Sequence, residues 1–162
     1  MKNKLYALLP LLFVLMTSCV QNEKPQQSTT ELEQTLNTFL DDWHRAAAKA
    51  DYEGYFGKIA EDGIYIGTDV TEHWTKTEFE GFSKPYFDRG KAWDFTAKER
   101  NLFVSKEGNI VWFDEVLDTW MGDCRTSGVL ENTKEGWKIK HYQLSVTVPN
   151  EKIQQFIDLI DG

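Results

Sequence analysis

The sequence predicts an α+β fold in which helices cover one face of a curved antiparallel sheet. Up to about residue 92 the apolar residues recur with the 3.6-residue period of helices, and from Trp93 onward they alternate with a period of two. Helices followed by consecutive strands are typical of α+β proteins. The 162 residues allow one such domain with short appendages.

The first eighteen residues have the composition of an export signal. Lys2 and Lys4 precede an apolar run from Leu5 to Met16, and two small residues, Thr17 and Ser18, follow it. The run is shorter than the roughly 20 residues that a membrane-spanning helix needs. A simple signal peptide cleaved near Ser18 is one interpretation.

Cys19 supports a more specific interpretation. Its position after Thr17 and Ser18 resembles the lipobox of bacterial lipoproteins, which implies that Cys19 is acylated and becomes the first residue of an anchored chain. Val20 stands where an inner-membrane retention signal has Asp, so the resemblance favours the outer membrane or a periplasm-facing location. The predicted organisation is a signal peptide at 1–18, a polar tether at 19–30 and one domain at 31–162.

Three helices are predicted in the first half of the domain. Thr30 and Glu33 form a capping box before a long amphipathic helix, and Asp51 caps a short helix with Tyr55, Phe56 and Ile59. Thr75 and Glu78 form another capping box, before a third helix that contains Pro85. The stripe of the first helix consists of Leu32, Leu36, Phe39, Leu40, Trp43, Ala46, Ala47 and Ala50.

The strands come mainly from the second half. A brief strand is expected at Ile64–Ile66, between Gly63 and Gly67. Four longer strands are predicted at 93–104, 110–120, 124–131 and 137–148, with turns short enough for hairpins. A closing amphipathic segment carries Ile153, Phe156, Ile157 and Ile160.

The last strand changes character along its length. One face begins with Trp137 and Ile139 and continues with His141 and Gln143, whereas the opposite face begins charged and becomes apolar. Either a bulge near His141 reverses the alternation, or the first face lines a polar cavity while the other meets a second subunit. We favour the second interpretation, which predicts a homodimer through the convex face, with Tyr142, Leu144 and Val146 in the interface.

Hairpin register then brings two candidate catalytic residues together. It places Thr126 and Glu115 on the same inner face as His141, and a carboxylate beside an imidazole in a poorly hydrated site is suited to proton transfer. Alternatively, Glu115 and His141 form a buried structural pair without a catalytic role. A slip of one residue turns Asp114 inward instead of Glu115.

Composition and spacing exclude several classes of function. The formal charge of -8 becomes more negative without Lys2 and Lys4, and such acidity is unsuited to nucleic acid. The histidines share no metal-ligand spacing, and no glycine pattern of a phosphate loop is present, so we expect no metal and no cofactor. His44 lies beside the first helix's apolar stripe, as a helix-face or pocket-edge residue. Cys124 is expected to be a small buried strand residue.

Several sequence blocks resemble SnoaL-like proteins of the nuclear-transport-factor-2-like superfamily. The resemblance spans about Leu36 to Pro149, and its blocks are Ile66–Asp69, Trp74–Thr75, Trp112–Glu115, Leu117–Thr119, Gly128–Leu130, Gly136–Ile139, His141–Tyr142 and Leu144–Val146. It implies a cone-shaped α+β roll with a pocket between the helices and the concave sheet, and frequent dimers through the convex sheet. The family includes isomerases, dehydratases, cyclases and non-enzymatic binding domains, so the fold does not decide the chemistry.

Candidate ligand-binding residues lie near the expected pocket. Tyr65 and Asp69 are at the end of the first strand, although Asp69 also suits a loop-capping role. Trp93 and Trp137 are expected to contact an apolar molecule, with Thr126 and Gln143 as polar contacts. The favoured hypothesis is an envelope protein that binds an unknown small, partly apolar molecule. The alternatives are a proton-transfer enzyme that uses Glu115 and His141, and a protein-interaction module without a ligand.

Overall fold

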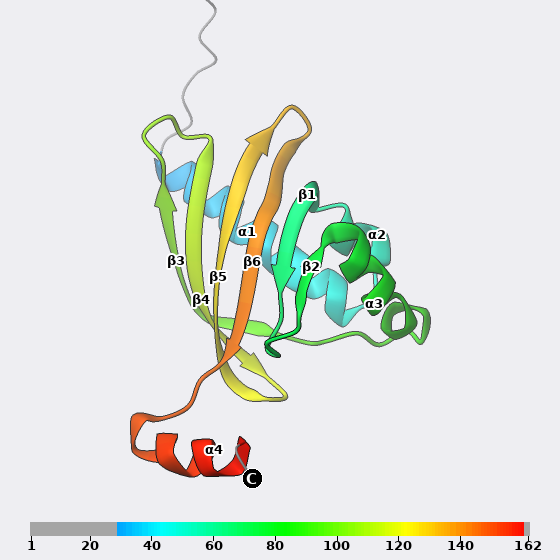
Figure 1. The fold of residues 1–162 in the computed structure, drawn as a ribbon. Coiled ribbons are helices and arrows are strands. Elements are labelled where there is room, and N and C mark those ends of the chain that lie inside the picture. Colours follow the sequence, from blue (N-terminus) through cyan, green and yellow to red (C-terminus); the bar gives the residue numbers. More distant parts are fainter. Residues whose placement is uncertain (1–28, 161–162) are drawn as a thin grey trace, which may run out of the picture.

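The computed structural model describes residues 29–160. The predicted signal peptide, the lipidation site at Cys19 and most of the predicted tether lie outside these residues. Figure 1 shows the N-terminal helices packed on one side of a single curved sheet. The elements are α1 (Thr29–Ala48), α2 (Tyr52–Phe56), β1 (Ile59–Ile66), β2 (His73–Thr75), α3 (Lys76–Asp88), β3 (Thr96–Val104), β4 (Ile110–Thr119), β5 (Gly122–Thr133), β6 (Gly136–Val146), a 3-10 turn (Asn150–Lys152) and α4 (Ile153–Ile160).

The capping signals of the sequence mark two helix starts correctly. The Asp51 carboxylate accepts a hydrogen bond from the Gly54 amide at 3.0 Å at the start of α2. Thr75 and Glu78 form the predicted capping box of α3, in which the Glu78 carboxylate accepts from the Thr75 amide at 2.8 Å. Pro85 lies inside α3, as predicted. Ile59 belongs to β1 instead of the second helix.

The sheet is mixed, which corrects the prediction of a wholly antiparallel sheet. Its strand order is β2-β1-β6-β5-β4-β3, and β1 runs parallel to β6. The four-stranded meander β3–β6 is antiparallel, as predicted. Periodicity identifies strands but not their neighbours, and the return of the last strand beside β1 is a long-range pairing that the sequence pattern does not contain.

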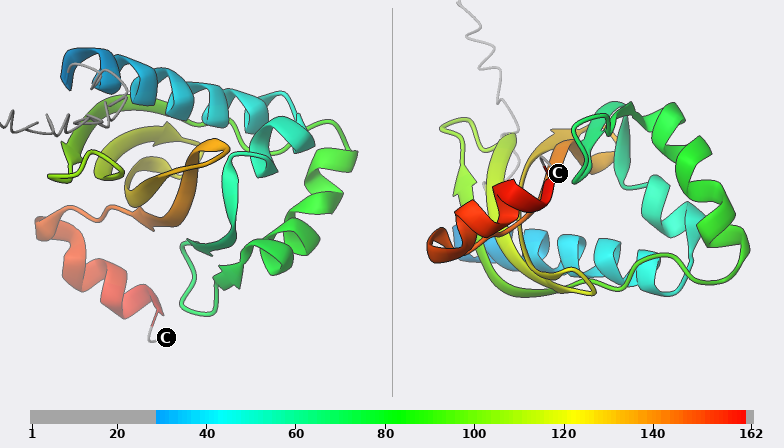
Figure 2. Two further views of the ribbon diagram at one scale, coloured as in Figure 1. Left: turned by 90° about the horizontal axis from the view of Figure 1, so that it is seen from above. Right: turned by 60° about the horizontal axis from the view of Figure 1, so that its bottom comes forward.

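The core lies between the concave face of the sheet and the helices. Leu36, Leu40 and Trp43 of α1 are buried there, and the Trp43 ring meets Tyr142 of β6 at 4.7 Å between centroids. Figure 2 shows α1 crossing the sheet while α2 and α3 lie beside β1 and β2. Inner positions of β4 and β5 follow the predicted alternation, because Phe113, Glu115, Leu117, Cys124, Thr126, Gly128 and Leu130 are all buried.

A bulge in β6 reverses its alternation. Val129 pairs with His141, but the next residue, Leu130, pairs with Ile139, so β6 has one extra residue there. Ile139 faces the core before the bulge, and Tyr142 and Leu144 face it afterwards. His141 therefore lies on the outer face, beside Val129. The sequence analysis favoured a polar inner face lined by His141 and Gln143, and this interpretation was wrong. The other interpretation, a bulge near His141, is confirmed.

The bulge also corrects the predicted dimer surface. Tyr142 is 1% exposed and Leu144 is 5% exposed, so both lie in the core of this chain and are not on its convex face. Only Val146 among the three predicted interface residues is exposed. The convex face instead presents Trp112 and Phe103, whose rings stack at 6.0 Å.

The closing amphipathic segment forms α4. Figure 1 shows this helix beyond the end of β6, apart from the other helices. Every residue from Ile153 to Ile160 is exposed, including the apolar side chains of Phe156 and Ile157. Within residues 29–160, no helix has the length and apolar character needed to cross a membrane.

Candidate functional site

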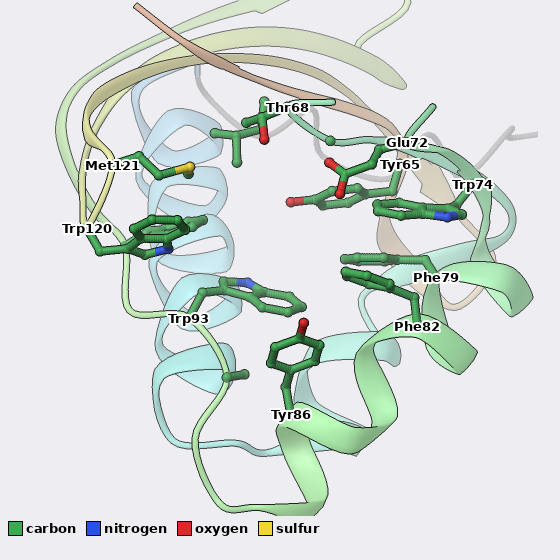
Figure 3. A pocket seen from close by; sticks show the side chains of 14 residues that line it. Tyr65, Thr68, Glu72, Trp74, Phe79, Phe82, Tyr86, Trp93, Trp120 and Met121 are labelled. Atoms are coloured by element: carbon green, nitrogen blue, oxygen red, sulfur yellow. The ribbon is translucent and has the colours of Figure 1, made fainter. Parts of the chain in front are cut away.

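An open cavity of about 210 Å³ lies between β1, β2, α3 and the turn that joins β4 to β5. Figure 3 shows its walls from close by. Most of the lining side chains are aromatic or otherwise apolar. They are Tyr65, Thr68, Glu72, Trp74, Phe79, Phe82, Tyr86, Ala92, Trp93, Phe95, Trp120, Met121 and Leu144, with Gly67 completing the wall.

Stacked rings form one wall of the cavity. Tyr65 and Phe79 stack with 3.8 Å between their centroids, and Trp74 stacks on Phe82 at 4.6 Å. The Trp93 ring is nearly parallel to that of Phe79, at 5.7 Å. These contacts link β1, β2 and α3 to the segment before β3, so the wall is held by packing between several elements. The cavity is therefore a largely preformed site for a flat or compact apolar group.

Glu72 provides the carboxylate of the site. Its backbone closes the loop between β1 and β2, since Glu72 O accepts from the Gly67 amide at 2.9 Å. Its side-chain Oε2 accepts from the Asp69 amide at 3.1 Å. Gly67 is required for this arrangement, because a Cβ at position 67 would lie 2.1 Å from Glu72 Oε2.

Hydroxyl groups add polar character to the same space. Figure 3 shows the carboxylate of Glu72 and the hydroxyls of Tyr65 and Tyr86 directed into the cavity. Burial raises the pKa of Tyr65, and the nearby Glu72 carboxylate raises it further, so the phenol stays protonated at neutral pH. Tyr65 can therefore donate a hydrogen bond to a bound molecule.

The structure distributes the predicted ligand-binding residues over several places. Tyr65 and Trp93 are on the cavity wall. Asp69 is beside the cavity but caps the loop, where its Oδ1 accepts from the amide and the hydroxyl of Thr71 at 2.8 and 2.6 Å. These hydrogen bonds lower the pKa of Asp69. Thr126 is buried away from the cavity, beside Glu115.

Two further predicted contact residues do not line the cavity. Trp137 pairs with Asn132 beside the turn between β5 and β6, and it packs against the core from there. Gln143 is exposed on the outer face, after the bulge. The sequence analysis placed Trp137 and Gln143 on the inner face because it assumed uninterrupted alternation along the last strand. Trp137 keeps its inner position but is at the wrong end of β6.

The predicted catalytic pair is not formed. His141 lies on the outer face, where it neighbours Val129 and Ile64 in the adjacent strands. Glu115 faces the core, as predicted, and Asp114 instead pairs with Arg125 on the outside. The two candidate groups are on opposite faces of the sheet, which rules out direct proton transfer between them.

Glu115 has other partners, which the sequence analysis missed. Arg100 of β3 donates from Nε to Glu115 Oε1 at 2.6 Å, and His44 Nε2 lies 3.1 Å from Oε2. Thr126 Oγ1 donates to Oε2 at 3.4 Å. Arg100 continues to α1, where Nη1 donates to Asn37 O at 3.0 Å. This buried cluster joins α1 to three strands.

The charge of Glu115 is stabilised within the protein. Burial alone raises the pKa of Glu115, but the hydrogen bond and charge of His44, together with the Arg100 guanidinium, outweigh that effect and lower it. The Glu115 side chain is 0% exposed and does not line the cavity. Tyr142 separates the two, since its ring lies 6.5 Å from His44 and 5.3 Å from Tyr65.

The residues that form most of the cavity had only weak signals in the sequence. Phe79 and Phe82 belong to the predicted third helix, but the pattern does not tell which of its aromatic residues border a space. Glu72 lies in a loop without a motif, and Trp120 and Met121 lie in a predicted turn. Arg100 had a usable signal, because it faces Glu115 across the hairpin of β3 and β4.

The fold recurs in solved structures of low sequence identity. An NTF2-like protein of unknown function from Pseudomonas putida superposes with a TM-score of 0.63 at 12% identity, over 78% of this chain and 94% of that one. A domain of unknown function with a cystatin-like fold from Nostoc punctiforme gives 0.64 at 21% identity, over 83% and 88%. An NTF2-like protein from Cytophaga hutchinsonii gives 0.60 at 14% identity, over 71% and 98%.

These similarities establish the fold alone, because all three identities are low. No curated protein matches the chain in sequence. The family model of the SnoaL-like domain, however, matches residues 36–149, which include every strand and most of α1. The chain therefore belongs to the SnoaL-like domain family, with the NTF2-like fold.

Proposed function

We propose that this protein binds a small, partly apolar molecule in the cavity beside α3 without transforming it chemically. The observation that carries the proposal is the cavity itself, which is walled by stacked aromatic rings and has few polar groups. Such a combination is typical of small-molecule sites, where apolar surface supplies affinity and a few polar groups orient the ligand.

The position of Glu115 favours binding over proton-transfer chemistry. A general base must come within hydrogen-bond reach of the proton that it removes. The Glu115 carboxylate is fully enclosed by His44, Arg100 and Thr126, and the cavity wall begins beyond the Tyr142 ring. The cluster is better suited to fastening α1 to the sheet than to contacting a substrate.

The binding proposal is tested by the molecules that copurify with the protein. Native mass spectrometry of the full chain should detect a small molecule that is lost from the variant Ala92→Phe, whose added ring enters the cavity. Thermal unfolding of both proteins checks that the variant is folded. A copurified molecule retained by a folded Ala92→Phe variant, or the absence of binding by any member of a library of small aromatic molecules, contradicts the proposal.

We further propose that the protein is exported and anchored through acylated Cys19, as the N-terminal sequence predicts. The cavity domain would then face the cell envelope. Cys19→Ala should move the protein from the membrane fraction to the soluble fraction while its thermal unfolding is unchanged. Cys124→Ala is the matched control, because Cys124 is buried within the domain. Membrane association that persists in Cys19→Ala contradicts anchoring by acylation.

A homodimer through the convex face is also proposed, with a surface different from the predicted one. Trp112 is 47% exposed and Phe103 is 44% exposed, and two adjacent exposed rings on a sheet face mark an association site. A second copy is the occupant that the family resemblance implies, and twofold symmetry would place the same patch on both sides. Trp112→Glu should yield monomers in sedimentation, whereas Trp120→Glu, at an exposed ring of the cavity wall, should not. Equal masses for wild type and Trp112→Glu contradict the interface.

A further inference from the structure

We infer that the ligand of the aromatic cavity is an organic cation, with an ammonium group bound beside Glu72 and over the faces of the surrounding rings. This inference rests on the proposed binding function and specifies its ligand class. Three observations support it: the charge of the wall, the geometry of Glu72 and the size of the cavity.

The cavity wall has an acidic group and no basic one. Among the described residues that line it, Glu72 is the sole charged side chain, and none is Lys, Arg or His. The faces of Trp, Tyr and Phe rings carry negative electrostatic potential, which attracts a cation placed over them. Eight of the lining residues are aromatic, so the rings and the carboxylate favour the same sign of ligand charge.

The chain already has a cation next to one of these rings. The guanidinium of Arg89 lies 4.8 Å from the centroid of Tyr86, although Arg89 does not line the cavity. The faces of Tyr65 and Trp74 are partly covered by stacking on other rings of the wall. The Trp120 ring, which is 82% exposed and also lines the cavity, is available to a ligand (Figure 3).

Glu72 is held in place before any ligand binds. Its Oε2 accepts from the Asp69 amide, and Oε1 has no hydrogen-bond partner among the residues that the structure describes. Backbone hydrogen bonds close the loop from Gly67 to Glu72. Little conformational entropy is therefore lost when the Glu72 carboxylate binds a ligand. One of its oxygens is thus free to accept from an ammonium group or to neutralise a quaternary one.

Other charge classes fit the site less well. An anion would be repelled by Glu72, and the net charge of -8 adds a long-range field that repels anions and attracts cations. A neutral apolar molecule would cover the half-buried carboxylate without replacing its water, which is unfavourable. A cation removes this penalty by compensating the charge.

The volume limits the ligand to a small molecule. A cavity of about 150 Å³ is large enough to bind benzene. The cavity of about 210 Å³ therefore has room for one ring with a short ammonium substituent, or for a compact quaternary ammonium group.

The test uses a charged molecule and its neutral isostere. Phenyltrimethylammonium and tert-butylbenzene have nearly the same shape and differ in charge, and benzoate serves as the anion. Binding is measured by quenching of tryptophan fluorescence and by calorimetry. We expect the cation to bind at least about tenfold more tightly than the neutral isostere, as a desolvated cation–π contact with a carboxylate allows, and benzoate not to bind.

Two variants locate the effect at Glu72. Glu72→Gln should weaken binding of the cation about tenfold and leave the neutral isostere unchanged or improved. Gly67→Ala should act in the same direction, because its methyl group displaces the Glu72 carboxylate. Asp94→Asn is the matched control, since it removes one negative charge between the lining residues Trp93 and Phe95 without touching the wall.

The outcomes separate this inference from the function on which it rests. If the neutral isostere binds as tightly as the cation, or if Glu72→Gln leaves cation affinity unchanged, the cavity binds ligands but is not selective for cations, and the inference is wrong. If neither molecule binds to the wild-type protein, the inference is wrong, and the binding function fails with it only if no member of the library of small aromatic molecules binds either.

Discussion

Arg100 and Glu115 face each other across β3 and β4 and form a buried ion pair, with 2.6 Å between Arg100 Nε and Glu115 Oε1. The side chain of Arg100 is 6% exposed and that of Glu115 is 0% exposed. Arg100 also pairs with Asp41 of α1 at 2.9 Å, so the pair is part of a link between helix and sheet. Buried pairs of this kind are costly to break, because the remaining charge has no water to solvate it.

We therefore expect Arg100→Met to lower the free energy of unfolding by about 3–5 kcal/mol. The control is Arg125→Met, which removes the same charge from a pair with Asp114 on the outer face at 3.4 Å. That exposed pair should contribute less than about 1 kcal/mol. Urea denaturation of both variants provides the comparison, and equal losses would show that the Glu115 cluster is not a major contributor to stability.

The same cluster predicts a pH dependence with a definite sign. The pKa of Glu115 is lower in the folded protein than its ordinary value of 4.5, so ionised Glu115 stabilises the fold above that pH. This contribution is lost as the pH falls through the lowered folded pKa. Glu115→Gln cannot ionise, and the stability difference between wild type and this variant should be largest above about pH 5 and shrink toward pH 3. A difference that is constant over this range, measured by urea denaturation, contradicts the lowered pKa.

The bulge in β6 is tested by two adjacent residues. Tyr142 faces the core, so Tyr142→Ala should cost about 3–5 kcal/mol. His141 faces outward, and His141→Ala should cost less than about 1 kcal/mol and leave ligand binding unchanged. An uninterrupted strand would reverse the two results, so a large loss for His141→Ala together with a small one for Tyr142→Ala would exclude the bulge.

The fold class could be predicted from the sequence because the helix-capping residues and the hydrophobic periodicity both indicate it. The capping groups Asp51 and Thr75 mark helix starts by short-range hydrogen bonds, and the period-two pattern defines the meander β3–β6. The parallel pairing of β1 with β6 was missed, since it joins segments more than seventy residues apart. Pairing over such a distance is decided by packing, which periodicity does not encode.

The candidate site was harder to predict, because a register shift of one residue in β6 determines which side chains face the core. The extra residue in β6 turns His141 outward and Tyr142 inward, opposite to the prediction. The predicted catalytic pair and the predicted dimer surface both depended on these two orientations, so both were wrong. A signal was nevertheless present at Gly128, which pairs with Tyr142. A Cβ there would lie 2.5 Å from the Phe113 ring and 2.8 Å from His141 O, so the strands approach closely beside the bulge.

The isolation of α4 leads to a last prediction. No residue of α4 is buried, and the family match ends at residue 149, before this helix begins. A helix of eight residues gains little stability by itself, so it should add almost nothing to the stability of the domain.

Ending the chain after Pro149 should therefore change the free energy of unfolding by less than about 0.5 kcal/mol. Ending it after Gln143 also removes Leu144, which is 5% exposed and lines the cavity, and should destabilise the protein strongly. Urea denaturation of the two shortened chains distinguishes these expectations. A loss of about 2 kcal/mol or more on ending after Pro149 would mean that the apolar side of α4 packs against the domain in solution, since burial of one or two large apolar side chains contributes that much.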